Sequence, residues 1–227
     1  MHPRAIPSAY QPGGPVRRTL LILAALFLMA PAITLTAADK TFTPDTIHSR
    51  IGFSAKTIFK VEGNFGKYAT EISGDPDTLD NAKVRLEIDV ASINTENKSR
   101  DTHLKTPDFF DAAKYPKIVF TSSKVWRQGG QVMVQGALDM HGVKKELTIP
   151  FEPAFGKNGA GNDTWSYEGS LKINRNDFGL GSDSIAAKLS LKDTVEMNLQ
   201  LVGFFHEKET EKAEPSKAPA KKQKKAA

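Results

Sequence analysis

The sequence has no cysteine among its 227 residues. This absence excludes disulfides, thiolate metal ligands, a cysteine nucleophile and the cysteine that carries a lipoprotein anchor. An exported domain made from this chain would therefore have to be stable through its core alone.

Signals for catalysis are also scarce. There is no Gly-x-Ser-x-Gly elbow and no glycine-rich phosphate loop. Ser49 adjoins His48, but neighbours on a strand point to opposite faces and cannot pair as nucleophile and base. His48, His103 and His141 are candidates for a metal site, although their spacing matches no short metal motif. The alternative is that each histidine caps a turn or closes a hydrogen bond near a barrel mouth. We therefore predict no enzyme, no cofactor and no metal.

The middle of the chain has almost no net charge. The whole sequence carries 31 Lys and Arg against 26 Asp and Glu. Three Arg and no acid fall in residues 1–38, and seven Lys with four Glu fall in residues 207–227, so residues 39–206 hold 21 basic and 22 acidic side chains. The basic character lies in the two ends, and the body gives no indication of nucleic-acid binding.

The two ends differ from the body in composition. Arg17-Arg18 precede an apolar run from Leu20 to Ala30, which is followed by Pro31 and then by the small residues Thr36-Ala37-Ala38. The run falls short of the roughly 20 residues of a spanning helix, so we predict a signal peptide over 1–38, cleaved near Ala38, and a periplasmic or secreted protein. Residues 207–227 are predicted to be a disordered tail. The tail either solubilises the protein or makes weak contact with an anionic membrane surface.

Between the ends, apolar residues recur with period two, as in the run Val132, Val134, Gly136, Leu138 and Met140. Such runs predict strands with one apolar face, and several are about ten residues long, longer than the usual five or six. Only 99–113 looks helical, and Pro107 should split that stretch into two short turns. The pattern favours an all-β fold, a barrel or a sandwich, with the strand length favouring an antiparallel barrel.

One stretch carries a family resemblance. Arg100-Asp101, His103-Leu104, Phe109-Phe110 and Tyr115-Pro116 precede an alternating strand, in the order R-D-x-H-L, F-F-D, Y-P. This order resembles the YceI-like family. Further matches in the same order are His48-Ser49, Gly63-Asn64-Phe65, Ser92-Ile93, Gly136-Ala137-Leu138, His141-Gly142-Val143 and Asn174 to Gly179. The resemblance implies an eight-stranded lipocalin-like barrel with one short helical connection, which binds polyisoprenoid lipids such as polyprenyl phosphates or quinone-like molecules.

The ligand-binding residues that we predict on this basis are inward strand positions: Phe53, Phe65, Leu86, Ile88, Phe120, Val134, Leu138, Phe151, Leu171 and Ile173. Arg100 and Arg175 are candidates for binding a polar head group, because a guanidinium can donate paired hydrogen bonds to a phosphate. The competing interpretation is that both arginines hold the local chain in place. Phe109 and Phe110 would line a lipid channel or plug the barrel. The alternative function is a ligand-free structural or stress-response protein of the envelope.

Overall fold

The computed structural model describes residues 40–207. The predicted signal peptide over 1–38 lies outside the described residues, and so does the predicted tail over 207–227 except for Glu207, which instead ends the last strand. Eleven strands form within this range: β1 (Lys40–Pro44), β2 (Arg50–Lys56), β3 (Lys60–Phe65), β4 (Tyr68–Ser73), β5 (Lys83–Asp89), β6 (Ile93–Asn94), β7 (Lys117–Gln128), β8 (Gln131–Met140), β9 (Val143–Lys157), β10 (Asp163–Asn174) and β11 (Thr194–Glu207).

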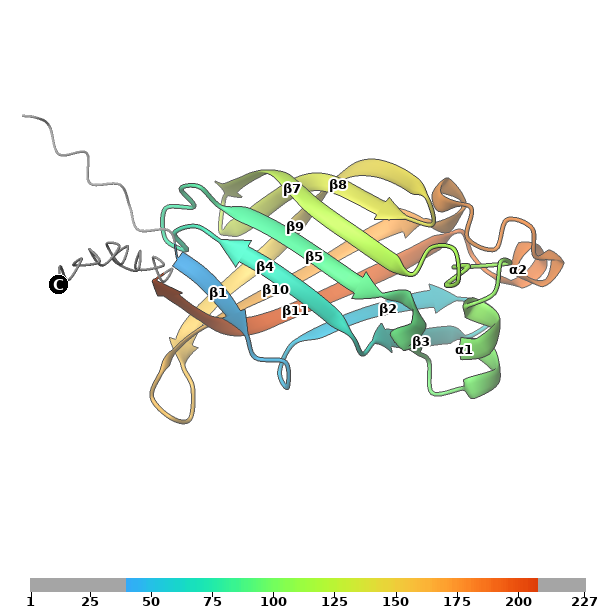
Figure 1. Cartoon of the computed structure of the whole chain (residues 1–227), viewed down its shortest axis with the longest axis horizontal. Coiled ribbons are helices and arrows are strands. Elements are labelled where there is room, and N and C mark those ends of the chain that lie inside the picture. The colour runs from blue at the N-terminus through green and yellow to red at the C-terminus, as the bar shows by residue number, and fades with distance from the viewer. Residues whose placement is uncertain (1–39, 208–227) are drawn as a thin grey trace, which may run out of the picture. The chain divides into compact units, whose positions relative to one another are not determined.

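The strands close into a barrel (Figure 1). The ring runs β1-β4-β5-β7-β8-β9-β10-β11, and β11 pairs again with β1. β1 and β2 pair with successive parts of β11, so they are two halves of one strand that is interrupted at 45–49. β3 continues β4 in the same way and pairs with β2 and β6. The predicted eight-stranded antiparallel barrel is therefore confirmed.

The period-two pattern accounts for the core. On β8, Val132, Val134, Gly136 and Met140 are buried, while the other residues are only partly buried. The buried side chains of the other strands join them in one cluster inside the barrel. Because alternate side chains point to opposite faces, each strand contributes its apolar face to this interior.

Two short helices lie at the same end of the barrel (Figure 1). α1 (Lys98–Leu104) starts at Asn97, whose side chain accepts from the Arg100 amide at 3.0 Å. It ends before Pro107, and turns follow, as the sequence indicates. The predicted single helical connection is wrong in one respect, because α2 (Ile185–Ser190) is a second one. Its six residues are too few to show a helical period, although Ser184 caps its first turn.

The remaining helical turns are two 3₁₀ segments, η1 (Val90–Ser92) and η2 (Arg175–Phe178). No helix within residues 40–207 is both long enough and apolar enough to cross a membrane.

Candidate functional site

The interior of the barrel brings together all ten apolar residues predicted to face a ligand. Six of them belong to the buried core: Phe65, Leu86, Ile88, Phe120, Val134 and Phe151. The other four are partly buried and pack against it: Phe53, Leu138, Leu171 and Ile173. Their placement on the inner face agrees with the sequence pattern, and their role in holding a ligand stays a prediction.

A cavity of about 80 Å³ lies at the end of the barrel that carries the helices. We call it the helix-end cavity. Its lining side chains are apolar except for Arg175, and they come from strands, from α1 and from the chain on both sides of α2: Phe53, Ala55, Phe65, Leu104, Phe109, Phe110, Ile118, Met140, Ile173, Leu180, Leu191, Val195 and Met197. This composition suits the end of a hydrocarbon chain and gives one cationic group beside it.

Phe109 and Phe110 close this cavity. The Phe110 ring packs edge-on against Phe65 at 6.1 Å between centroids, and the Phe109 ring packs against His103 at 5.1 Å. The Gly181 amide donates to the Asp108 carbonyl at 2.9 Å, which ties the two connecting segments together over the barrel end. Both phenylalanines thus line the cavity and form part of its plug.

A second cavity, of about 60 Å³, lies toward the β4–β5 loop and is called the loop-end cavity. Val132, Val134, Phe151, Tyr167 and Leu201 are among its lining residues. Burial raises the pKa of Tyr167 to about 12, because the phenolate would lose hydration there. Between the two cavities, side chains fill the middle of the interior.

Aromatic rings in the interior lie against glycines of the neighbouring strand. A Cβ on Gly169 would stand 2.6 Å from the Phe151 ring, and one on Gly136 would stand 2.8 Å from the Phe120 ring. A Cβ on Gly63 would likewise meet the Phe53 ring. These inward glycines let the rings lie close to the wall, so the width of the interior depends on them.

Arg100 does not line the helix-end cavity and instead bonds to the chain just before α1. Its guanidinium donates to the Thr95 side-chain oxygen at 2.8 Å and to the Thr95 carbonyl at 2.7 Å. The Asp101 carboxylate accepts from the amide and the hydroxyl of Thr95. The geometry favours the structural interpretation for Arg100, since both side chains fix the buried Thr95 next to α1.

Arg175 is only 3% exposed and stands at the edge of the helix-end cavity. Its guanidinium donates to the carbonyls of Leu180 at 2.8 Å, Lys192 at 3.2 Å and Leu191 at 3.4 Å. It also pairs with the Asp193 carboxylate at 3.1 Å. Most of its hydrogen-bonding capacity is used by the chain around α2, which favours the structural interpretation here too.

The three histidines have separate local partners. His48 pairs with Asp45 at 2.7 Å, and this hydrogen bond lowers the pKa of Asp45. His103 lies 3.3 Å from Asp108, and His141 Nδ1 lies 2.8 Å from the Phe178 carbonyl. Within residues 40–207, no group of three or more His, Asp or Glu side chains is arranged to hold a metal ion. Each histidine thus closes a turn or a hydrogen bond near a strand end.

Two inward hydroxyls were not found from the sequence. The Tyr68 and Thr70 side chains lie on one face of β4, and their buried oxygens have no hydrogen-bond partner among the described residues. Burial raises the pKa of Tyr68, partly offset by the Ser49 hydroxyl, whose own hydrogen bonds go to the Val202 backbone. Period-two alternation places Tyr68 inside but cannot show that its hydroxyl is left unpaired.

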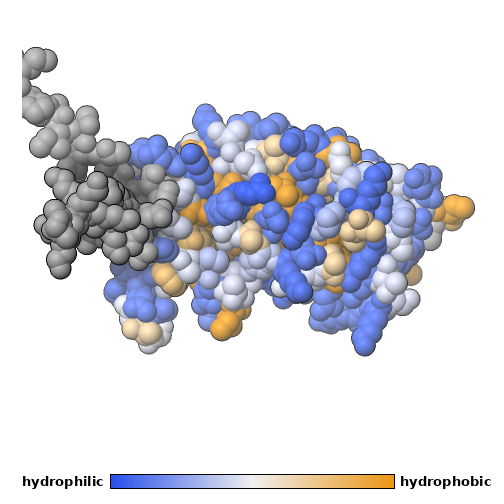
Figure 2. Space-filling model, in the orientation of Figure 1, coloured by the Kyte–Doolittle hydropathy of each residue, from blue (hydrophilic) through white to orange (hydrophobic). Residues whose placement is uncertain are grey.

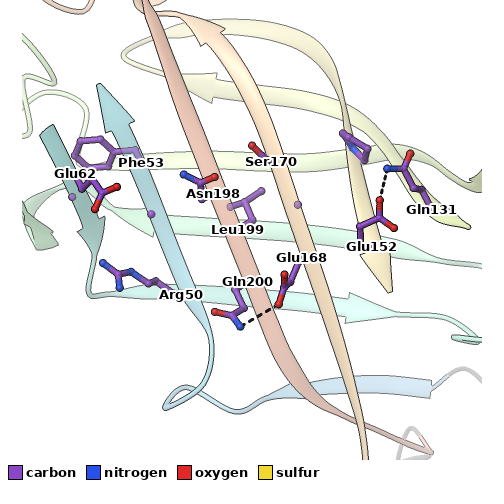
Figure 3. A pocket seen from close by; sticks show the side chains of 14 residues that line it. Arg50, Phe53, Glu62, Gln131, Glu152, Glu168, Ser170, Asn198, Leu199 and Gln200 are labelled. Atoms are coloured by element: carbon purple, nitrogen blue, oxygen red, sulfur yellow. Dashed lines mark hydrogen bonds between the residues drawn. The ribbon is translucent and has the colours of Figure 1, made fainter. Parts of the chain in front are cut away.

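An open groove of about 620 Å³ lies on the outer face of the barrel, over β2, β3 and β9–β11 (Figure 3). Its polar side chains pair with one another: Gln200 donates to Glu168 at 3.5 Å, and Gln131 donates to Glu152 at 2.6 Å. An apolar chain laid here would cover carboxylates and amides without replacing their contacts with water. The interior is therefore the better candidate site for an apolar ligand.

Comparison with known proteins agrees with this architecture. A model of the YceI-like domain matches residues 42–203. A UPF0312 protein of Vibrio cholerae is 30% identical over 173 residues, which cover 73% of this chain and 89% of the relative. The crystal structure of Burkholderia cenocepacia BcnA is similar with a TM-score of 0.64 and 27% identity, covering 71% of this chain and 100% of BcnA.

A third structure, described as a polyisoprenoid binding domain from Saccharophagus degradans, has a TM-score of 0.52 at 16% identity, covering 74% of this chain and 98% of that domain. At this identity the likeness concerns the fold. The domain match over nearly the whole barrel, together with the Vibrio relative, shows that the chain belongs to the YceI-like family.

Proposed function

We propose that this protein is an exported, non-enzymatic binder that holds a long-chain isoprenoid lipid, of polyprenyl phosphate or quinone-like type, in its barrel. The observation that carries the proposal is the apolar inner face, which runs between two apolar cavities at opposite ends. The polyisoprenoid-binding domain of Saccharophagus degradans, which has a similar fold, supports the ligand class.

The energetics of an apolar chain favour such a site. Burying each CH₂ group contributes about 0.8 kcal/mol, so several isoprene units offset the cost of ordering the ligand without a polar contact. The buried hydroxyls of Tyr68 and Thr70 line neither cavity, so they would donate to a carbonyl or phosphate oxygen of the ligand only once the interior widens.

The size of the cavities requires side chains to move when the lipid binds. Volumes of about 60 and 80 Å³ are well below the roughly 300–1,000 Å³ of ordinary ligand pockets. Of the ten predicted ligand-binding residues, Phe53, Leu138, Leu171 and Ile173 are the four that are only partly buried. We infer that the barrel widens along these positions to admit the chain.

The filled interior also favours the second candidate, a ligand-free structural or stress-response protein of the envelope. Mass spectrometry of an organic extract of the purified protein separates the two candidates. We expect a stoichiometric isoprenoid lipid in the extract. A folded protein that repeatedly yields no lipid would favour the structural role.

A pair of variants on β8 tests the interior directly. Leu138→Arg places a charge on the inner face and should lower lipid recovery strongly, because the buried guanidinium has no partner there. Gln135→Arg on the outer face is the control and should leave recovery unchanged. Equal recovery from both folded variants would refute binding in the barrel.

A further inference from the structure

Four large apolar side chains are exposed at the helix end of the barrel. Ile58 and Phe59 form the tip of the β2–β3 hairpin and are 93% and 58% exposed; Ile185 and Leu189 of α2 are 76% and 84% exposed. Ile185 and Leu189 are four residues apart, so they share one face of the helix. Figure 2 shows an apolar projection at the end where Figure 1 places α2. We call these four residues the apolar tip.

The two parts of the apolar tip are joined at the backbone. The Lys192 amide, just after α2, donates to the Lys56 carbonyl at the end of β2 at 2.8 Å. The pairing of β11 with β2 then begins at Val195 and Ala55. Leu191, Ala55 and Val195 line the helix-end cavity from the inside. The apolar tip therefore lies directly over the chain that closes this cavity.

Positive charge predominates in the two segments that carry the apolar tip. Residues 56–60 and 185–192 contain Lys56, Lys60, Lys188 and Lys192 and no acidic residue. Of the neighbouring acids, Glu62 pairs with Lys60 at 2.6 Å, Asp193 pairs with Arg175, and Asp183 is exposed just before α2. Lysines surrounding exposed apolar side chains match a surface with anionic head groups above hydrocarbon.

We propose that the helix end of the barrel docks on a bilayer containing anionic phospholipid, with the apolar tip inserted among the head groups. Such docking brings the helix-end cavity to the membrane, so the bound lipid comes from the bilayer itself. That last point rests on the proposed function, whereas vesicle binding itself does not. Ile47, 87% exposed at the β1–β2 interruption, is an apolar residue outside the apolar tip and serves as its control.

The test is sedimentation of the whole protein with vesicles of phosphatidylcholine alone or mixed with phosphatidylglycerol. Leu189→Ser combined with Ile185→Ser should weaken partition by about ten-fold or more, because two apolar contacts with the membrane are lost. Ile47→Ser should bind as the unchanged protein does. Residues 1–39 and 208–227 are the same in every variant, so their contribution cancels in the comparison.

A second pair of variants tests the charge. Lys188→Gln with Lys192→Gln should weaken binding to the anionic vesicles and leave binding to phosphatidylcholine unchanged. Equal partition of the apolar double variant and Ile47→Ser, with both folded by circular dichroism, would overturn the proposal. A change in oligomeric state without a change in vesicle binding would assign the surface to a second copy of the chain and would also overturn it. Lipid in the organic extract of the unchanged protein reports on the proposed function independently.

Discussion

Arg175→Gln tests whether this arginine stabilises the barrel end or serves a ligand. The change removes the positive charge and most of four hydrogen bonds. The bond to the Leu180 carbonyl is fully buried, and an unsatisfied buried acceptor costs about 1–3 kcal/mol. The bonds to Leu191 and Lys192 are partly buried and should add about 1 kcal/mol together. Asp193 is 61% exposed and is hydrated once freed, so its ion pair adds little.

We therefore expect the variant to lose about 3 kcal/mol of unfolding free energy, equivalent to about 6–12 °C in Tm for a domain of this size. Urea unfolding followed by tryptophan fluorescence measures the loss. Arg175→Lys keeps the positive charge but not the planar guanidinium with its several donors, so it should lose less unfolding free energy than Arg175→Gln. Binding of a polyprenyl phosphate and of the uncharged polyprenol should fall alike. A loss below about 1 kcal/mol, with selective weakening of the phosphate ligand, would refute the structural role.

Three further predictions concern two interior residues and one exposed turn. Gly169→Ala should lower the unfolding free energy by about 1–3 kcal/mol, because its Cβ would meet the Phe151 ring at 2.6 Å; Gly156→Ala, with open space around it, is the control in the same denaturation assay. Tyr167 has a pKa raised to about 12 by burial, so the folded state holds this proton more tightly than the unfolded state. Its contribution to stability should be complete below pH about 10 and lost as the pH rises toward 12, and Tyr167→Phe should remove that part of the alkaline loss. At the β1–β2 interruption, the hydrogen bond from His48 lowers the pKa of Asp45, so His48→Ala should raise the pKa of Asp45 in an NMR titration, and an unchanged Asp45 titration would contradict the contact at 2.7 Å.

The sequence determined the inner face of the barrel. Period-two alternation is a local property, so the positions of Val134 and Phe151 on the inner face followed from their neighbours alone. The family resemblance supplied the number of strands and the closure, which alternation does not encode. α2 was missed, since six residues between loops carry no period.

Only the tertiary structure decided what the interior and its end can do. The helix-end cavity is lined by residues from Phe53 to Met197, so its volume depends on how side chains from distant strands pack. Arg175 was a head-group candidate in the sequence, and the structural interpretation is now favoured because its guanidinium donates to three carbonyls on the two sides of α2. The apolar tip likewise joins a hairpin and a helix more than 120 residues apart. Such contacts arise when the barrel closes. A local sequence pattern does not predict which distant residues this closure brings together.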